Sequence, residues 1–398
     1  MTLYRASIRH ALSSNRIEEF ADGLLAVGED GKILDCGPYD SIVTKFSNHK
    51  IEDFRGNWIL PGFVDCHVHL PQLDCRNKVG FTLFDWLKTY IFPAEASFSD
   101  PKKIREVAPR FYDELLSHGV TTAAIYSTVH AEATDAAFEW AHEKGLRAII
   151  GQVLMDQNAP HELIRSSSQL LRETEQLIVK WHEKDSRLFY AVTPRFALTC
   201  SKKLLEGAGR LAEESKVYWQ THLAETKREV ADAESMHGFR NYVSFYESNH
   251  SLTPRSIFAH CIYLKEEEWH RLSESHCAVA HCPTSNVFLQ SGTMPWEQVE
   301  KNHLRVGLGS DVGGGPTFSM SEIIDCACEV HPQGQMDHEK GFYLATLGGA
   351  ETLSLENQIG NFLPGKWADF SLFDSAAFHG RAKKVFVAGK SVLYDGGL

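Results

Sequence analysis

The chain has 398 residues, of which 43% are hydrophobic, 23% charged and 11% aromatic, a profile that excludes a disordered, collagen-like or coiled-coil protein. Its 40 lysines and arginines against 52 aspartates and glutamates give a formal net charge of -12, which disfavours nucleic acid and anionic membranes as partners. No uncharged apolar run approaches the ~20 residues of a membrane span, and residues 1–12 lack the apolar core of a signal peptide.

Both ends of the chain are predicted to be rich in β-structure. At the start, apolar runs at 24–27 and 32–34 flank an Asp-Gly pair at 30–31, which is typical of a β-hairpin. Near the end, residues 369–373 and 385–390 again have the composition of strands. The middle of the chain does not share this character.

The middle alternates between short β runs and helical stretches. The β runs lie at 62–66, 119–125, 146–154, 188–193, 216–221, 256–259, 277–280 and 305–309, and helical patterns lie at 131–144, 163–178, 201–214 and 226–235. Such alternation predicts parallel strands with helical crossovers, and eight of them predict a closed (β/α)8 barrel of the α/β class. An open doubly wound sheet is the alternative, although no GxGxxG or P-loop signature supports it.

Candidate metal ligands follow the predicted strands, at the end where such a barrel carries its chemistry. His67 and His69 follow the first strand, and histidines at i and i+2 of an extended segment point to the same side. His222 follows the fifth strand, His260 the sixth and Asp311 the eighth. Three imidazole nitrogens and one carboxylate suit Zn²⁺, with Fe²⁺ as the second choice, and one histidine is left over.

These residues, with the segment 61–69, resemble the motifs of the amidohydrolase superfamily, and the resemblance covers nearly the whole chain. It implies a (β/α)8 barrel at 59–360. It also implies a small β-sandwich domain formed from both termini, at 1–58 and 361–398.

A narrower resemblance, to the guanine deaminases, rests on further motifs. These are Pro71-Gln72, the segment 84–95, Pro194-Arg195-Phe196, AHCPTSN at 280–286 and the segment 345–350. The resemblance implies hydrolysis of guanine to xanthine and ammonia, in purine catabolism or salvage, by a homodimer. This chain is shorter than expected between the eighth strand and the C-terminal sandwich, a difference that bears on substrate access.

The resemblance implies a single metal held by His67, His69, His222 and Asp311. Binuclear members of the superfamily carry a bridging lysine at the end of the fourth strand, where this chain has Thr-Pro-Arg at 193–195. One Zn²⁺ per chain is therefore expected.

Proton chemistry is assigned by the same resemblance. Asp311 takes a proton from the attacking water, and His260 orients that water by a hydrogen bond. Glu225 protonates the ring nitrogen beside the attacked carbon and then helps to deliver a proton to the departing amine. The alternative for Glu225 is that it caps the helix that begins near Thr226.

Guanine recognition is assigned to five residues. Arg195 offers directed donors to the O6 atom, with a salt bridge at the strand end as the alternative. The Gln72 amide both donates to and accepts from the N1–H/O6 edge. Phe196 and Trp86 are predicted to stack on or enclose the purine, with core packing as the favoured alternative for Trp86. His281 is a further predicted contact, with packing inside its loop as the alternative.

Two other functions stay open. One is a related metal-dependent deaminase or chlorohydrolase that acts on 8-oxoguanine, a pterin or a triazine, although Arg195-Phe196 favours a guanine-like carbonyl. The other is a non-catalytic scaffold, which the complete ligand set disfavours. The three glycines at 313–315 lack a P-loop lysine, so we predict a loop of close backbone approach rather than a phosphate cradle.

The nine cysteines are scattered along the chain and form no CxxC pair. An odd number without such pairs disfavours a disulfide framework and a cysteine-based zinc site. We expect small buried thiols in a reducing compartment, which predicts a cytoplasmic protein.

Overall fold

The computed structural model describes residues 1–46, 48–78, 82–331 and 334–394. Its strands are β1 (Thr2–Ser13), β2 (Arg16–Val27), β3 (Ile33–Pro38), β4 (Ile51–Pro61), β5 (Phe63–His69), β6 (Val120–Tyr126), β7 (Arg147–Gly151), β8 (Val153–Leu154), β9 (Leu188–Pro194), β10 (Tyr218–Leu223), β11 (Ser256–His260), β12 (Ala278–His281), β13 (Arg305–Leu308), β14 (Phe370–Phe373), β15 (Lys384–Val387) and β16 (Lys390–Tyr394). Its α-helices are α1 (Tyr39–Val43), α2 (Leu83–Trp86), α3 (Phe92–Ala96), α4 (Pro101–Ser117), α5 (Ala131–Lys144), α6 (Ser167–Trp181), α7 (Lys202–Ser215), α8 (Lys227–His237), α9 (Tyr242–Glu247), α10 (Glu266–Glu274), α11 (Pro283–Phe288), α12 (Trp296–Lys301), α13 (Met320–Val330), α14 (His338–Ala345) and α15 (Leu347–Thr352). Shorter helical turns are η1 (Thr44–Phe46), η2 (Leu70–Cys75), η3 (Leu87–Ile91), η4 (Ser97–Ser99), η5 (His161–Leu163) and η6 (Ala197–Thr199).

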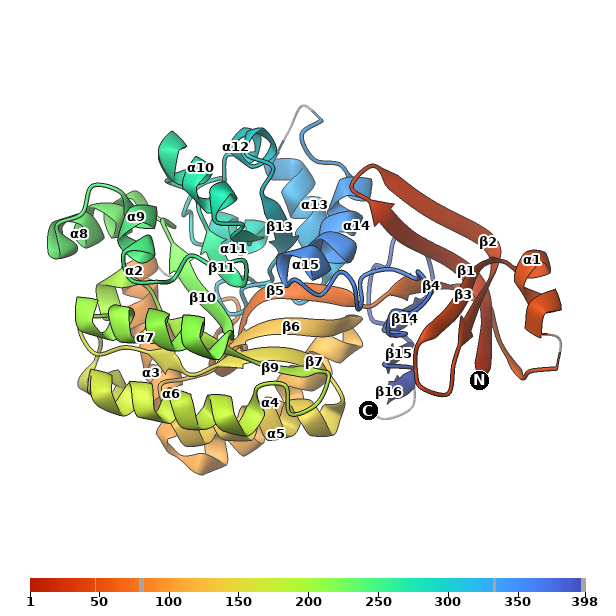
Figure 1. Ribbon diagram of the computed structural model, residues 1–398, viewed down its shortest axis with the longest axis horizontal. Helices are drawn as coiled ribbons and strands as arrows, with labels where there is room; N and C mark the ends of the chain where they lie inside the picture. The colour runs from red at the N-terminus through yellow and green to blue at the C-terminus, as the bar shows by residue number, and fades with distance from the viewer. Residues whose placement is uncertain (47, 79–81, 332–333, 395–398) are drawn as a thin grey trace.

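Parallel strands form the predicted (β/α)8 barrel, which is confirmed (Figure 1). Their order is β5-β6-β7-β9-β10-β11-β12-β13, and β8 continues the position of β7 by pairing with β9. The seam between β13 and β5 is bridged just beyond β13, where the Asp311 N–H donates to the His67 carbonyl at 2.8 Å and the His69 N–H donates to the Val312 carbonyl at 3.1 Å. These bonds fix the segment after β13 directly against the end of β5.

Amphipathic helices surround the barrel, as the periodicity predicts. In α4 the buried side chains Ile104, Val107, Phe111 and Leu115 recur every three or four residues and pack inward. The end of α5 is set by Gly145, which adopts the left-handed conformation at φ 77° that glycine accepts without a side-chain clash. Within the described part of the chain, no helix is long and apolar enough to cross a membrane.

The two ends of the chain meet in one seven-stranded sheet, in the order β16-β15-β14-β4-β1-β2-β3. Figure 1 shows its red and blue strands gathered on one side of the barrel. The predicted hairpin is the β2–β3 pair, with Val27 opposite Ile33. The division at 58/59 and 360/361 stays a prediction, and β4 crosses the first of these positions because it runs on almost to β5.

The terminal sheet packs against the amino-terminal ends of the barrel strands. Phe63, at the start of β5, lies 5.8 Å from Phe373 and 5.0 Å from Phe378 between ring centroids. Arg147, at the start of β7, donates from Nε to Oδ2 of Asp369 at 3.2 Å, and both side chains are buried. The carboxyl-terminal ends of the strands, on the opposite side of the barrel, are left for the candidate site.

Candidate active site

Four potential metal ligands meet at the carboxyl-terminal end of the barrel. The Nε2 atom of His69 lies 3.2 Å from the Nε2 atoms of both His67 and His222. Oδ1 of Asp311 lies 3.2 Å from His67 Nε2 and 3.3 Å from His69 Nε2. One ligand atom from each residue lies within 4.8 Å of all the others. The structure therefore brings together the four residues that the sequence predicts.

The protonation states of these groups fit a divalent metal. Burial lowers the pKa of His67, lowers that of His69 to about 3 and lowers that of His222 far below the ordinary range. Burial opposes ionisation of Asp311, yet its contacts with His67 and His69 hold the pKa of this carboxyl well below its usual value. Neutral imidazoles and an ionised carboxylate are the forms that bind Zn²⁺.

The orientation of His222 gives a further test of the fit. Its Nδ1–H donates to the carbonyl of Arg195 at 2.6 Å, which leaves the lone pair of Nε2 directed at the other ligands. The Nε2 atom of His69 lies at about hydrogen-bond distance from those of His67 and His222. Neutral imidazoles whose Nε2 atoms carry no proton cannot form hydrogen bonds between these atoms, so a cation bound between them is favoured. The residues present thus suit a metal held by three nitrogens and one oxygen.

His260 and Glu225 lie beside the ligand group. His260 donates from Nδ1 to Oδ1 of Asn286 at 2.8 Å, and its Nε2 lies 3.7 Å from Oε2 of Glu225 and 3.9 Å from Oδ2 of Asp311. Burial lowers the pKa of His260, but the two carboxylates outweigh it and the net shift is upward. Burial raises the pKa of Glu225, whose Oε1 accepts from the Ser291 hydroxyl at 2.7 Å. A buried carboxyl with a raised pKa is suited to general acid catalysis.

The structure does not give Glu225 the alternative role, which was to cap the helix that begins near Thr226. Helix α8 is capped by Thr226, whose hydroxyl accepts from the N–H of Glu229, while the Glu229 carboxylate accepts from the Thr226 N–H in return. The Glu229 carboxylate also accepts from the Glu225 N–H at 2.7 Å. Glu229 thus takes the cap, and the side chain of Glu225 is left to face the cavity.

Three residues at the same strand ends have an unusual backbone conformation. Ala224, His260 and Asp311 have φ values of 52°, 69° and 47°, in the left-handed region that residues other than glycine seldom adopt. Such conformations cost about 1–3 kcal/mol each and cluster at functional sites. The glycine loop also makes the close approach predicted for it, because a Cβ on Gly315 would lie 1.8 Å from the Ser310 carbonyl oxygen.

A cavity next to the ligand group holds most of the predicted substrate contacts. Those that line it are Gln72, Trp86, Arg195 and Phe196, together with Glu225, His260 and the ligands His69, His222 and Asp311. Trp86 also donates its indole N–H to the Lys78 carbonyl at 2.7 Å, which fixes the ring as one wall. His281 lies outside this cavity, with its Nε2 3.1 Å from Nε2 of His331.

Four polar partners of the site escape the sequence analysis. They are Glu95, Glu229, Asn286 and Ser291. The Thr-x-x-Glu spacing at 226–229 is a readable capping signature for Glu229. Glu95 and Asn286 lie within recognised motifs, but nothing local marks them as buried partners, and Ser291 carries no signal at all.

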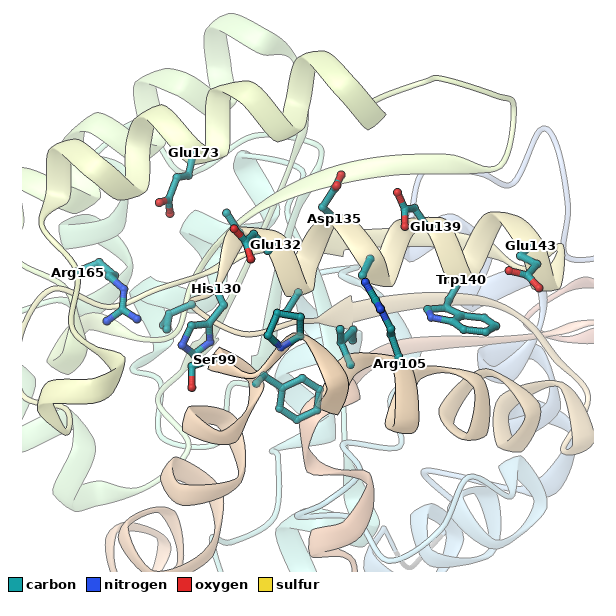
Figure 2. A pocket seen from close by; sticks show the side chains of 17 residues that line it. Ser99, Arg105, His130, Glu132, Asp135, Glu139, Trp140, Glu143, Arg165 and Glu173 are labelled. Carbon is teal, nitrogen blue, oxygen red and sulfur yellow. The ribbon is translucent and has the colours of Figure 1, made fainter.

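A larger hollow, of about 540 Å³, lies on the outside of the barrel between α4, α5 and α6 (Figure 2). Charges of both signs line it, among them Arg105, Glu132 and Glu139, which are exposed. Asp135, on the same wall, is already paired with Lys180 at 2.7 Å. This hollow shares no lining residue with the cavity of the candidate site.

Comparison with known proteins bears on the whole chain. The sequence profile of the amidohydrolase family matches residues 58–392. A guanine deaminase of Escherichia coli is 40% identical over 361 residues, which span 89% of this chain and 82% of that protein, and one of Rattus norvegicus is 33% identical over 94% and 87%. Among solved structures, the E. coli guanine deaminase superimposes with a TM-score of 0.94 at 34% identity over 100% of both chains. A guanine deaminase from C. acetobutylicum with guanine bound in the active site gives 0.92 at 27% identity, over 98% of this chain and 100% of that chain.

Proposed function

The chain belongs to the amidohydrolase family, and we propose that it hydrolyses guanine to xanthine and ammonia. One observation carries this proposal. One cavity is lined by three of the four ligands, by Glu225, and by Arg195 and Gln72. The ligand group with Glu225 suits attack by water on an aminated carbon, and Arg195 with Gln72 suits a heterocycle with a carbonyl next to an N–H group.

One metal per chain, Zn²⁺ with Fe²⁺ as the second choice, is proposed at His67, His69, His222 and Asp311. When bound there, it activates water as a nucleophile at neutral pH. Oδ2 of Asp311, the oxygen other than the one in contact with His67 and His69, is placed to accept a proton from that water. His260 Nε2, 3.9 Å from the same oxygen, is placed to orient the water by a hydrogen bond.

Glu225 is proposed as the residue that moves protons to the substrate. It protonates the ring nitrogen beside the attacked carbon, so that the carbon can form its new C–O bond without a full negative charge on the ring. The proton that Asp311 took from water is then delivered, with the help of Glu225, to the exocyclic amine. The C–N bond breaks, ammonia leaves, and the new hydroxyl group on the carbon returns a proton to Glu225 as it becomes the carbonyl of xanthine. The Ser291 hydroxyl holds one oxygen of Glu225, which leaves the other free for this transfer.

Arg195 and Gln72 are proposed to bind the O6 and N1–H edge of guanine, with Phe196 and Trp86 enclosing the ring. His281 contacts His331 instead and is left out of this set. The homodimer and the cytoplasmic location are proposals that rest on the family resemblance and the cysteine pattern. Sedimentation and cell fractionation test them.

Ammonia release from guanine tests the proposal directly, with adenine, cytosine and 8-oxoguanine as the comparison set. We expect guanine to be the preferred substrate and adenine and cytosine to be inert, because neither has a carbonyl next to a ring N–H in the position that Arg195 serves. Turnover of 8-oxoguanine with a higher kcat/KM than guanine would assign the enzyme to a different substrate. No ammonia from any of the four would refute a purine deaminase.

A further inference from the structure

A buried glutamate on α3 joins the two residues proposed to read the polar edge of guanine. Glu95 has no exposed surface, and its Oε1 accepts from Arg195 Nη1 at 2.6 Å and from Gln72 Nε2 at 3.0 Å. Arg195 follows β9 and Gln72 lies in η2, so the contacts span 100 and 23 residues of sequence. One carboxylate oxygen therefore sets the relative position of two groups that come from different parts of the barrel.

The same helix also restrains Arg195 in a second direction. Phe92 lies three residues before Glu95, on the same face of α3, and its ring centroid is 5.5 Å from the guanidinium carbon of Arg195. The Phe92 ring contacts the guanidinium of Arg195 on one side, and the Glu95 carboxylate accepts a hydrogen bond from one of its nitrogens. Arg195 also lines the cavity, and only one of its guanidinium nitrogens is bonded to Glu95.

Gln72 is fixed by the same carboxylate. A carboxylate accepts only, so the Gln72 group that points at Glu95 must be its NH₂. Its Oε1 lies toward Gly313, whose N–H donates at 3.4 Å. With both ends of the amide engaged, the side chain cannot exchange its donor and acceptor, and it presents one defined pattern to the cavity.

We propose that Glu95 is a positioning residue for substrate recognition, which orients Arg195 and Gln72 together toward the carbonyl and N–H edge of the purine. This inference rests on the proposed function. It assigns specificity to a residue that has no place on the cavity wall. It also predicts that the affinity for a ligand without the carbonyl does not depend on Glu95.

The test compares guanine with 2-aminopurine, which keeps the amine and the ring but lacks the carbonyl oxygen. Glu95→Gln suits it because Oε2 is buried without a partner among the described residues, so an amide can keep its oxygen at the Oε1 position. We expect the KM for guanine to rise about tenfold, since charge-assisted hydrogen bonds are roughly twice as strong as neutral ones. The kcat and the metal content should stay near wild-type, and the inhibition constant of 2-aminopurine should change less than about twofold.

Glu268→Gln is the matched control. Glu268 is also a buried carboxylate, but it accepts from the backbone N–H groups of Tyr242, Val243 and Lys265, away from the cavity wall. Its variant should leave the KM for guanine unchanged. If Glu95→Gln weakens guanine and 2-aminopurine equally, Glu95 is only structural and the inference is overturned. If wild-type protein fails to deaminate guanine, the proposed function has failed instead.

A double variant covers the case in which Glu95→Gln does not fold because it leaves the Arg195 charge buried alone. In an Arg195→Met background that charge is gone, and adding Glu95→Gln should lower kcat/KM for guanine by less than about threefold relative to Arg195→Met alone. This remaining loss measures the effect of Glu95 on Gln72. A loss of about tenfold or more relative to Arg195→Met alone would show that Glu95 does not act through Arg195.

Discussion

Two buried arginine–carboxylate pairs lie at opposite ends of the barrel. At the amino-terminal end, Arg147 pairs with Asp369, and its Nη1 also donates to the Ser186 carbonyl at 2.7 Å. At the carboxyl-terminal end, Arg195 pairs with Glu95. All four of these charged side chains are buried, so exposure and chemical type do not distinguish the pairs.

What distinguishes them is the use of the remaining polar atoms. The Asp369 carboxylate also accepts from the Ala388 N–H at 2.7 Å, and its carbonyl accepts from the Gly62 N–H, so this pair ties the terminal sheet to the barrel. In the second pair, Arg195 also lines the cavity of the candidate site. A barrel of this kind separates stability at one end from chemistry at the other, and under the proposed function the same type of interaction serves both.

The largest effect is expected from removing a ligand at the carboxyl-terminal end. Wild-type protein should bind about one divalent metal per chain, as a four-ligand site predicts. His222→Ala should lose both the metal and the activity, because it removes one of the four ligands that this site arranges around the ion. Elemental analysis beside an ammonia assay checks both. Full activity in metal-free protein would refute the mechanism, and two metals per active chain would refute a mononuclear site.

Glu225→Gln should bind metal and guanine yet turn over slowly. Glutamine preserves the size of the side chain but cannot transfer a proton, and general acid–base groups contribute typically 10²–10⁴-fold. Because the proposed mechanism uses Glu225 in two proton transfers, we expect kcat to fall by a factor near the upper end of this range. The measurement is kcat together with metal content. A variant with full metal and more than about a tenth of wild-type kcat would exclude Glu225 from the mechanism.

Asp369→Asn should separate the two ends of the barrel most clearly. Breaking a buried pair strands the charge of Arg147, which costs about 3–5 kcal/mol in the free energy of unfolding. The kcat/KM for guanine should stay within about twofold of wild-type while the protein is folded, because no catalytic group contacts Asp369. Denaturant unfolding and steady-state kinetics on the same preparation check this. A large loss of kcat/KM in folded protein would show that the two ends are coupled.

Arg195→Lys should do the opposite. Lysine keeps the positive charge near Glu95 but loses the planar fork, so stability should change little while recognition of guanine suffers. The loss of one charged hydrogen bond to substrate is expected to cost about 2–4 kcal/mol in kcat/KM. Metal content should not change. Guanine turnover at wild-type efficiency would remove Arg195 from the recognition of the carbonyl.

The sequence was most informative about the strand ends. His67, His69, His222, His260 and Asp311 could be placed because each follows a β run, and parallel strands in a barrel end at a common mouth. Their partners come from connecting segments whose positions depend on tertiary packing.

Glu95 lies 100 residues before Arg195, and Arg147 lies 222 residues before Asp369. Periodicity reports which face of an element is buried, but it does not report which distant residue lies opposite that face. The long-range pairs at both ends of the barrel were therefore beyond prediction from the sequence.

The smallest effect is expected at His281, which follows a barrel strand as the ligands do. Its position predicts a substrate contact, yet its Nε2 pairs with His331 Nε2 and its ring lies 6.3 Å from that of Trp296, outside the cavity. His281→Asn keeps a polar group in that pocket and should change the KM for guanine by less than about twofold, with a modest loss of stability from the broken buried hydrogen bond. Steady-state kinetics and thermal unfolding check this pair of results. A KM raised tenfold or more at unchanged stability would restore His281 to the substrate contacts.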